Sequence, residues 1–320
     1  MKRYGNLFEK ICDIDNIRLA HKNARKRKTH YKEVKEVDKD RDKYCYELKE
    51  LLESGKFKNS EYEIFTKNDK GKVREIYKLP YFPDRIVHHA IIQVVEPIWK
   101  NTLIKDTYQS IKGRGLHKAI RKIKKKVYSS KEDLNYLKID ISKFYPSIDN
   151  NILKCTIRHK IKCKKTLALL DEIIDSTVGV PIGNYLSQYF GNLYLSRVDH
   201  YVKETCKIKL YFRYCDDIVA INFQKSKLHE LKHNLRDMLK IVKLSIKANN
   251  CIRPISNGLD FLGVVVYNTY TQLRKTIKKK YVHRMRNLCD DKVIASYNGW
   301  LMACNAHNLK SKYENIRRIA

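Results

Sequence analysis

The sequence has no long apolar run and few acidic residues for its size. No stretch of about 18 apolar residues is present, and the N-terminus lacks a signal-peptide apolar segment, so neither a membrane span nor secretion is expected. Acidic residues number 35 against 67 Lys and Arg, which gives a net charge of +32 over 320 residues. This charge exceeds what solubility requires. It predicts a polyanionic partner, nucleic acid rather than a membrane, and binding that weakens strongly with salt.

Paired cysteine motifs are also missing. The nine Cys are odd in number and widely spaced, and no C-x-x-C occurs, so neither a disulfide framework nor a zinc knuckle is expected. Reduced thiols in a cytoplasm are the default expectation. The loop at 108–115 reads Y-Q-S-I-K-G-R-G and lacks the G-K-[ST] of a P-loop. What the chain does have is 43% hydrophobic residues, enough to fill one large core or two to three small ones.

The most informative stretch runs from Lys209 to Phe223. Two runs of β-branched and aromatic residues flank Tyr214-Cys215-Asp216-Asp217, which predicts a strand, a tight polar turn and a second strand. Adjacent carboxylates repel each other, and a half-buried pair is unfavourable unless a cation neutralises it. A solvent-facing Asp-Asp turn is the competing interpretation, because Asp favours turns for reasons of its own backbone.

A further carboxylate lies upstream, at the end of another predicted strand. Residues 136–141 alternate apolar and polar side chains, and Asp140 lies near the end of this run. Oxygen ligands at the ends of neighbouring strands suit magnesium, which prefers carboxylates and substrate phosphates. Two such ions about 4 Å apart would activate an attacking hydroxyl and stabilise a leaving pyrophosphate.

These two stretches together carry a family resemblance. K-I-D-I-S-K-F-Y followed by Y-C-D-D resembles the palm of reverse transcriptases, whose Y-x-D-D hairpin faces an aspartate on the adjacent strand. The resemblance implies an α+β right-hand polymerase, with fingers, a palm whose antiparallel sheet is backed by helices, and a small helical thumb. It assigns Asp140, Asp216 and Asp217 as catalytic ligands of two Mg²⁺ ions, and the backbone carbonyl of Ile141 as a further ligand.

Local patterns and the resemblance together predict the order of the domains. Helices are expected over 7–17 and 37–52, and a β-hairpin with its turn at 68–72. A basic helical run after Arg274 resembles a thumb that would cradle a duplex by its phosphates. The expected domains are an N-terminal helical extension at 1–55, fingers at 56–135, a palm at 136–270 with fingers-type helices around 151–178, and a thumb at 271–320.

Several residues are expected around an incoming deoxynucleotide. Arg74 would bind the triphosphate, a bidentate role that suits Arg better than Lys, although an ordinary exposed hairpin charge is the alternative. Arg85 either supports this pocket or makes an ion pair at the start of a helix. Tyr145 stands where the family has an aromatic ring that clashes with a 2′-hydroxyl, although an aromatic of the core is the alternative. Lys247 is a candidate for the lysine that protonates the leaving pyrophosphate.

The segment 179–188 points to one branch of the family. Most reverse transcriptases have Q-G-x-x-x-S-P here, whereas this chain has I-G-N-Y-L-S-Q, which resembles the I-G-x-x-x-S-Q of the reverse transcriptases of diversity-generating retroelements. Ile182, Gly183 and Gln188 are therefore assigned to the nucleotide pocket. A Gln at position 182 could hydrogen-bond the nucleotide and Ile cannot, which lowers discrimination by on the order of 1–3 kcal/mol. Enzymes of this branch copy RNA with frequent errors opposite adenine.

The resemblance also implies contacts with the nucleic-acid strands. Primer or template contacts are assigned to Lys112, Arg114, Tyr214, Phe261, Leu262 and Gly263. For the two cations, a solvated basic surface is the alternative. The implied partners are a template RNA, the RNA–cDNA duplex, dNTPs and a ring-forming basic accessory protein, in the cytoplasm of a bacterium or archaeon or of a phage-infected cell.

Two other interpretations stay open. One is a retron-type, defence-associated or group II intron-like reverse transcriptase, against which Ile182 argues. The other is a catalytically idle RNA-binding scaffold that keeps a polymerase shell. The three aspartates argue against the scaffold, because an idle site has no reason to keep three unfavourable carboxylates together.

Overall fold

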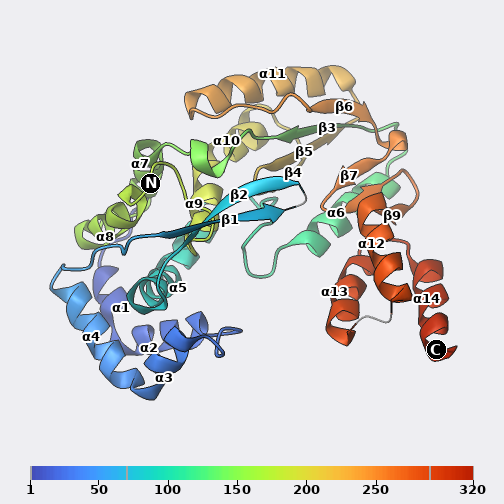
Figure 1. Ribbon diagram of the computed structural model, residues 1–320. Coiled ribbons are helices and arrows are strands. Elements are labelled where there is room, and N and C mark those ends of the chain that lie inside the picture. Colours follow the sequence, from blue (N-terminus) through green and yellow to red (C-terminus); the bar gives the residue numbers. More distant parts are fainter. Residues whose placement is uncertain (1, 70, 288–289, 320) are drawn as a thin grey trace. The chain divides into compact units, whose positions relative to one another are not determined.

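The computed structural model describes residues 2–69, 71–287 and 290–319, and its chain forms two compact units (Figure 1). Each unit is assembled from three separate segments, so the chain passes from one unit to the other several times. The first unit comprises Met1–Ile104, Ser142–His200 and Met238–Ser245, and the second comprises Lys105–Ile141, Tyr201–Asp237 and Ile246–Ala320.

The first unit begins with short helices packed around a long buried one. These are α1 (Phe8–Cys12), α2 (Ile14–Ala24), α3 (Lys32–Lys39), α4 (Arg41–Glu53) and the central α5 (Ile86–Lys100). The single helices expected over 7–17 and 37–52 are each divided in two, at Asp13 and at Asp40. The carboxylate of Asp13 accepts hydrogen bonds from the N–H groups of Asp15 and Asn16 and so starts a new helix. Asp40 has the non-helical angles φ −139° and ψ 59°.

A two-stranded hairpin and a second group of helices complete this unit. Strands β1 (Glu63–Asp69) and β2 (Lys72–Lys78) pair antiparallel, which confirms the hairpin; Lys70 in its turn lies outside the described residues. The Asn68 side chain accepts the N–H of Gly71 at 2.9 Å and closes this turn. The remaining elements are the π-helical turn Tyr81–Arg85, the 3₁₀ turn Tyr145–Ser147, α7 (Asn150–Arg158), α8 (Lys164–Asp175), α9 (Ser187–Tyr194) and α10 (Ser196–His200).

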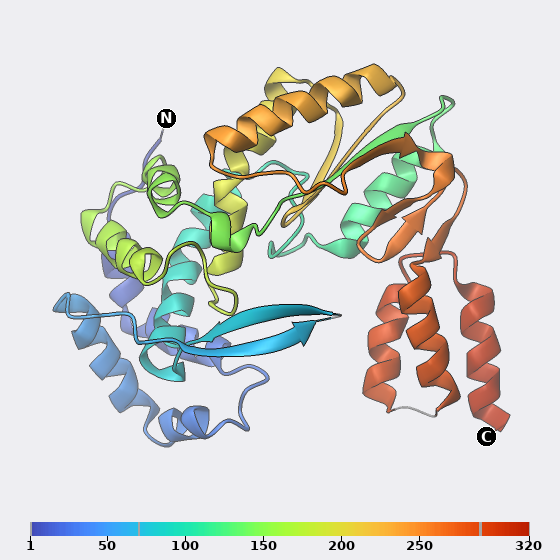
Figure 2. The ribbon, with the colours of Figure 1, turned by 45° about the horizontal axis from the view of Figure 1, so that its top comes forward.

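The second unit is built on a four-stranded antiparallel sheet. Its order is β4 (Leu210–Tyr214), β5 (Asp217–Asn222), β3 (Asn135–Asp140) and β6 (Cys251–Pro254). Helix α6 (Leu116–Tyr128) covers one face, and α11 (Lys225–Ile241), most of which belongs to this unit, runs along the other (Figures 1 and 2). The π-helical turn Tyr201–Thr205 precedes β4. This arrangement makes β3 an interior strand with a hydrogen-bonded neighbour on each side.

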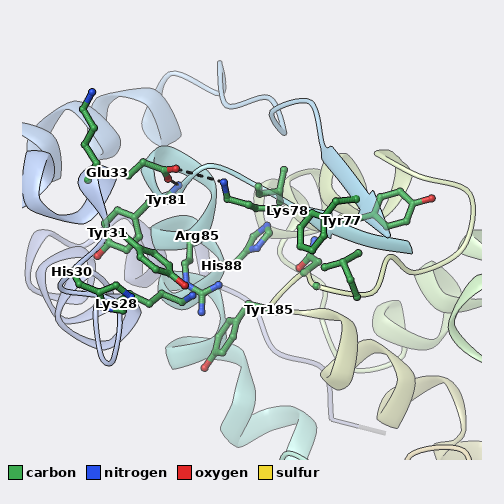
Figure 3. Close-up of a pocket in the computed structure, with 16 residues that line it drawn as sticks. Lys28, His30, Tyr31, Glu33, Tyr77, Lys78, Tyr81, Arg85, His88 and Tyr185 are labelled. Atoms are coloured by element: carbon green, nitrogen blue, oxygen red, sulfur yellow. Dashed lines mark hydrogen bonds and ion pairs between the residues drawn. The ribbon is translucent and has the colours of Figure 1, made fainter. Parts of the chain in front are cut away.

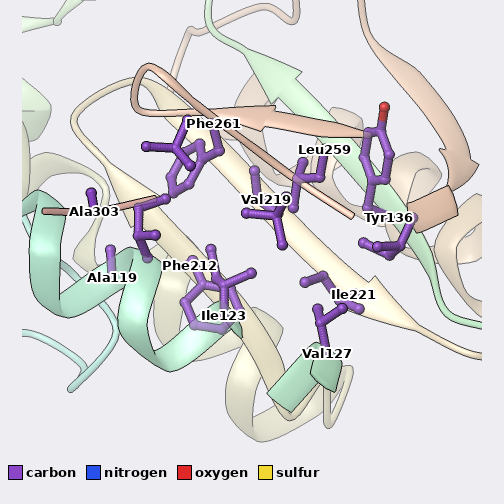
Figure 4. Close-up of a cluster of buried hydrophobic side chains, with 14 of the residues drawn as sticks. Ala119, Ile123, Val127, Tyr136, Phe212, Val219, Ile221, Leu259, Phe261 and Ala303 are labelled. Atoms are coloured by element: carbon purple, nitrogen blue, oxygen red, sulfur yellow. The ribbon is translucent and has the colours of Figure 1, made fainter. Parts of the chain in front are cut away.

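The spacing of apolar residues explains how α6 attaches to this sheet. Ala119, Ile120, Ile123 and Val127 form one stripe of the helix, whereas the other positions are mostly Lys and Arg. The stripe packs against Phe212, Val219 and Ile221 of the sheet and against Leu259 and Phe261 (Figure 4). Each large side chain buried in this way contributes roughly 1.5–3 kcal/mol relative to exposure.

The rest of the second unit is a small sheet followed by three helices. Strands β7 (Leu259–Phe261), β8 (Val264–Val266) and β9 (Thr271–Leu273) form the sheet, with the 3₁₀ turn Ile255–Asn257 before it. Helices α12 (Lys275–Arg286), α13 (Asp291–Leu301) and α14 (His307–Ile319) lie side by side in both views (Figure 2). They enclose a separate core of Leu273, Tyr281, Met285, Leu301 and Tyr313. Helices after Arg274 were expected from the sequence, and the structure confirms them.

Two further properties bear on the expectations from the sequence. Among the described residues, no helix is both long and apolar enough to cross a bilayer. The eight cysteines in the described part of the chain are all free thiols; the ninth, Cys289, lies outside it.

Candidate active site

Strand pairing brings the three expected aspartates to one end of the four-stranded sheet. In the β3–β5 pair Asp140 lies directly opposite Asp217, and in the β4–β5 pair Tyr214 lies opposite Asp217. Directly opposed residues of an antiparallel pair share a face, with Cα atoms about 4.5–5.5 Å apart. Asp216 is in the two-residue turn beside them. Carboxylates 76 positions apart in the sequence (140 and 216) therefore converge.

The turn that carries Asp216 has an unusual backbone. Cys215, its first residue, has φ +58°, in a place where two-residue hairpins commonly have Gly or Asn. The guanidinium of Arg213, which is fully buried, donates a hydrogen bond from Nη1 to the Cys215 carbonyl at 3.1 Å. This contact holds the turn, and with it the position of Asp216.

Burial and mutual repulsion act on the paired acids. The pKa of Asp217 is raised to about 6, mainly by burial; the charges of Asp216 and Asp140 act in the same direction, whereas Lys138 and Arg274 oppose the shift. Burial is also the main reason that the pKa of Asp216 is raised, and Asp140 adds to it. The solvent-facing Asp-Asp turn that the sequence left open does not fit these half-buried positions.

Asp140 has one oxygen engaged and one oxygen without a partner. Lys247 donates from Nζ to Oδ2 of Asp140 at 2.6 Å, and its backbone N–H donates to the Asp140 carbonyl at 2.9 Å. The other carboxylate oxygen, Oδ1, is buried and has no hydrogen-bond partner among the described residues. Ile141, the next residue, is fully buried and forms an isolated antiparallel bridge with Ile246.

This donor set fits a divalent cation that is shared with a substrate. An unpaired buried oxygen and two acids of raised pKa would all be stabilised by a positive charge. Within the described residues, no group of three or more His, Cys, Asp and Glu side chains is arranged to hold an ion. Mg²⁺ is commonly bound by one or two carboxylates together with substrate phosphates and water, so a complete protein cage is not required.

The first unit holds all the residues expected around the nucleotide except Lys247, and most of them line one cavity. Arg85, Tyr145, Ile182, Gly183 and Gln188 line one cavity of about 230 Å³, together with Asn184, Tyr185 and Ser187. Arg74 lies elsewhere, at an exposed position of β2 opposite Lys67. The sequence therefore predicted five residues of one cavity from segments that are far apart in the chain.

Close backbone contact joins this cavity to the hairpin. The N–H of Tyr77 donates to the carbonyl of Ile182 at 2.8 Å. Gly183 has φ +119°, and a Cβ on it would lie 2.4 Å from the Tyr77 carbonyl oxygen. Only Gly fits this approach, which accounts for its place in the motif.

A larger cavity of about 670 Å³ lies in the same unit (Figure 3). Cations and aromatic rings line it, among them Lys28, Tyr31, Lys78, Arg85 and Tyr185. Arg85 lies over the Tyr185 ring, 5.9 Å from its centroid, and makes no ion pair in the described part of the chain. Among the described residues, the helix-start ion pair considered for Arg85 is therefore not found. The sequence reasoning missed Tyr185, although it lies inside the recognised 179–188 segment.

Two histidines next to this cavity are neutral. Burial lowers the pKa of His88 and of His89 to about 3, so neither carries charge at neutral pH. His89 stacks on Tyr185 with ring centroids 3.9 Å apart. Positive charge in the cavity therefore comes from its Lys and Arg side chains, which suits an anionic ligand with a planar group.

The residues expected to contact primer or template all lie in the second unit. Tyr214 ends β4, Phe261 is buried in the core, and Leu262 and Gly263 form the turn between β7 and β8 with φ +51° and +80°. Lys112 is exposed in the loop before α6. Arg114 donates from Nη1 to the Thr107 carbonyl at 3.0 Å and so helps to hold that loop.

Comparison with known families agrees with this geometry. Residues 65–266, more than half of the chain and including all three aspartates, match the family described as reverse transcriptase (RNA-dependent DNA polymerase). This chain belongs to the reverse transcriptase family. The reverse transcriptase domain is that of an RNA-directed DNA polymerase, a nucleotidyltransferase, and domains of this family use divalent metal ions such as Mg²⁺.

Two curated relatives of this reverse transcriptase chain are more distant. Protein YkfC of Escherichia coli (strain K12) is 24% identical over 247 residues, which cover 62% of this chain and 65% of that protein. Nuclear intron maturase 1, mitochondrial, of Arabidopsis thaliana is 28% identical over 104 residues, which cover 32% of this chain and 14% of the maturase. The matched part is less than two thirds of the length of either relative.

Solved structures show the same fold. Apo telomerase from Candida tropicalis superposes with a TM-score of 0.54 at 14% identity, over 69% of this chain and 49% of that one. The Candida tropicalis telomerase in complex with the TWJ fragment of telomeric RNA gives 0.52 at 14% identity, over 68% and 45%. The mixed helix and sheet architecture is consistent with a right-hand polymerase, as the sequence predicted.

Proposed function

We propose that this protein is an RNA-directed DNA polymerase that copies a template RNA into cDNA. The observation that carries the proposal is the register of β3 and β5, which sets Asp140 opposite Asp217 with Asp216 in the adjoining turn. Three acids so arranged, inside the part of the chain that matches the family, suit nucleotidyl transfer. In this reaction the primer 3′-hydroxyl attacks the α-phosphate of a deoxynucleotide, and pyrophosphate leaves.

We assign Asp140 and Asp216 as the principal ligands of two Mg²⁺ ions, with Asp217 more peripheral and the carbonyl of Ile141 as a further ligand. Bound Mg²⁺ would lower the pKa of the attacking hydroxyl and neutralise charge on the phosphates. Lys247, whose ammonium contacts Asp140, is the proposed donor of a proton to the pyrophosphate. The support for these roles is that Asp140, Asp216, Asp217 and Lys247 lie together at this end of the sheet.

Other parts of the chain would hold the substrates. We assign nucleotide binding to Arg74, Arg85, Tyr145, Ile182, Gly183 and Gln188. All of these except Arg74 line one cavity. The proposed contacts to primer and template are Lys112, Arg114, Tyr214, Phe261, Leu262 and Gly263. The fingers, palm and thumb boundaries expected from the sequence remain part of this proposal.

We further propose that the enzyme is of the diversity-generating type and makes errors at template adenines. Ile182 supports this, because its side chain lines the nucleotide cavity and offers no hydrogen bond to the substrate. A ring-forming basic accessory protein is the proposed protein partner, and a reducing cytoplasm fits the free thiols. The retron-type alternative predicts evenly distributed errors, so sequencing the cDNA distinguishes the two.

Primer extension on an RNA template with Mg²⁺ tests the polymerase assignment. The wild-type chain should extend the primer, and joint replacement Asp216→Ala and Asp217→Ala should abolish extension. Asp237→Ala is the matched control, because this acid is exposed on α11 and has no proposed role. Full activity of the double variant would refute the assignment and favour the idle RNA-binding scaffold.

A further inference from the structure

One side chain of β3 ties the end of the sheet to the β7–β8 hairpin. Lys138 precedes Asp140 by two residues, so both project from the same face of the strand. The Lys138 ammonium donates to the backbone carbonyl of Asp260 at 2.6 Å. Lys138 therefore connects β3, the strand that carries Asp140, to β7, the strand that precedes the turn at Leu262 and Gly263.

Asp260 is held from its other side by the three-helix bundle. Arg274, the residue before α12, donates from Nε to both carboxylate oxygens of Asp260 at 2.8 and 2.9 Å, and its Nη2 lies 2.7 Å from Oδ1. The backbone N–H of Arg274 also donates to the Gly263 carbonyl at 2.9 Å. Because the pair is 36% and 43% exposed, it contributes little to folding stability, but its forked geometry fixes direction.

The turn itself has no free space on the bundle side. A Cβ on Gly263 would lie 2.2 Å from the Trp300 ring of α13 and 2.7 Å from Ile277 of α12. The turn is thus clamped: Lys138 of the sheet holds the Asp260 carbonyl on one side, and Ile277 and Trp300 of the bundle lie against Gly263 on the other. One face of α12 is strongly basic and forms a groove of about 430 Å³ lined by Lys275, Lys278, Lys279, Val282, His283, Arg286 and Asn287.

We propose that Lys138, Asp260 and Arg274 act as a positioning chain that sets the β7–β8 turn, and with it the primer end, relative to the carboxylates. Phosphates bound along the basic face of α12 would fix the position of this helix and of Arg274, the residue before it. Through its ion pair, Arg274 would in turn fix the position of Asp260. The inference rests on the proposed polymerase function. Lys138, Asp260 and Arg274 are positioning residues, since none is assigned to touch the reacting atoms.

The rate of single-nucleotide incorporation, measured at saturating duplex, tests the proposed role of Lys138, Asp260 and Arg274. Arg274→Lys keeps the charge but loses the fork, so it should slow incorporation by about tenfold or more, as should Asp260→Asn. The affinity for duplex should change by no more than about twofold. The double variant should be no slower than the slower single variant, because the two residues act as a unit. Lys227→Gln, an exposed α11 cation without an assigned role, is the control for general loss of charge in Arg274→Gln.

Wild-type incorporation rates in Arg274→Lys and Asp260→Asn would overturn the inference. It would also be overturned if Arg274→Gln slowed incorporation no more than Lys227→Gln does. A second readout does not need catalysis. In a Trp99→Phe background, Trp300 is the remaining tryptophan, and its emission reports packing on Gly263. Asp260→Asn should shift this emission to longer wavelength, and unchanged emission would contradict the clamp. If the wild-type chain extends no primer, the proposed function fails, and the emission alone decides whether the clamp exists.

Discussion

At the scale of single residues, the raised pKa of Asp217 predicts a pH dependence of stability. Its folded value of about 6 exceeds the ordinary 3.8, so between these values the folded chain binds more protons than the unfolded chain. The free energy of unfolding contributed by this group therefore falls as pH rises from about 4 to 6. Asp217→Asn lacks the charge, so it should be more stable than wild type by on the order of 1–3 kcal/mol at pH 7.

Urea unfolding of both proteins without divalent ions, from pH 4 to 8, checks this. The difference should vanish near pH 4, and Mg²⁺ should stabilise the wild type more than Asp217→Asn at pH 7. Parallel pH curves for the two proteins would show that Asp217 does not titrate as its burial implies.

The contact between Lys247 and Asp140 predicts two effects of opposite sign. Lys247→Gln removes a cation that competes with Mg²⁺ for Asp140, so Mg²⁺ should bind more tightly. The same change removes the proposed proton donor and should lower kcat by about 10²-fold. Calorimetric titration with Mg²⁺ and single-turnover extension measure the two separately. A parallel loss of metal affinity and rate would instead assign Lys247 to holding the site together.

At the scale of elements, the contact of Gly183 with Tyr77 predicts that Gly183→Ala displaces the β1–β2 hairpin. A methyl group there meets the Tyr77 carbonyl at 2.4 Å, at a φ that L-residues rarely adopt. We expect KM for the deoxynucleotide to rise by about tenfold or more, because Ile182 and Gly183 line the nucleotide cavity. Steady-state kinetics measure it. Gly299→Ala is the control. This helical glycine has open space around it, so the substitution should leave KM unchanged and stabilise the helix slightly.

Much at this scale could be predicted from sequence periodicity. Alternation predicted β3, and the β-branched and aromatic runs on each side of the Asp-Asp turn predicted β4 and β5, so Asp140 and Asp217 were expected together. The breaks at Asp13 and Asp40 were missed, because an Asp inside an apolar stripe looks like a solvent-facing position of one continuous helix. Lys138 was missed for another reason: its partner Asp260 is 122 positions away, and no local pattern encodes such a contact.

At the scale of the whole molecule, the charge of +32 predicts steep salt dependence of nucleic-acid binding. If the chain neutralises about six to ten phosphates, the affinity for an RNA–DNA duplex should fall by about 10³-fold or more between about 50 and 200 mM salt. Fluorescence anisotropy across this range gives the slope. Thermal unfolding in the same buffers is the control, because folding should respond far less. A flat slope would mean that most cations stay solvated and contact no phosphate.

The interior position of β3 has a consequence for the order in which the protein opens. Both edges of this strand are hydrogen-bonded, to β5 and to β6, whereas the β1–β2 hairpin is a sheet of two strands that exposes most of its side chains. Amide deuteration should therefore reach the hairpin within brief local openings, and reach Leu137 and Ile139 only when the sheet melts as a whole. Asp140, at the end of β3, should thus belong to the slowest-exchanging part of its unit. Mild heating should disturb the hairpin well before it displaces this carboxylate.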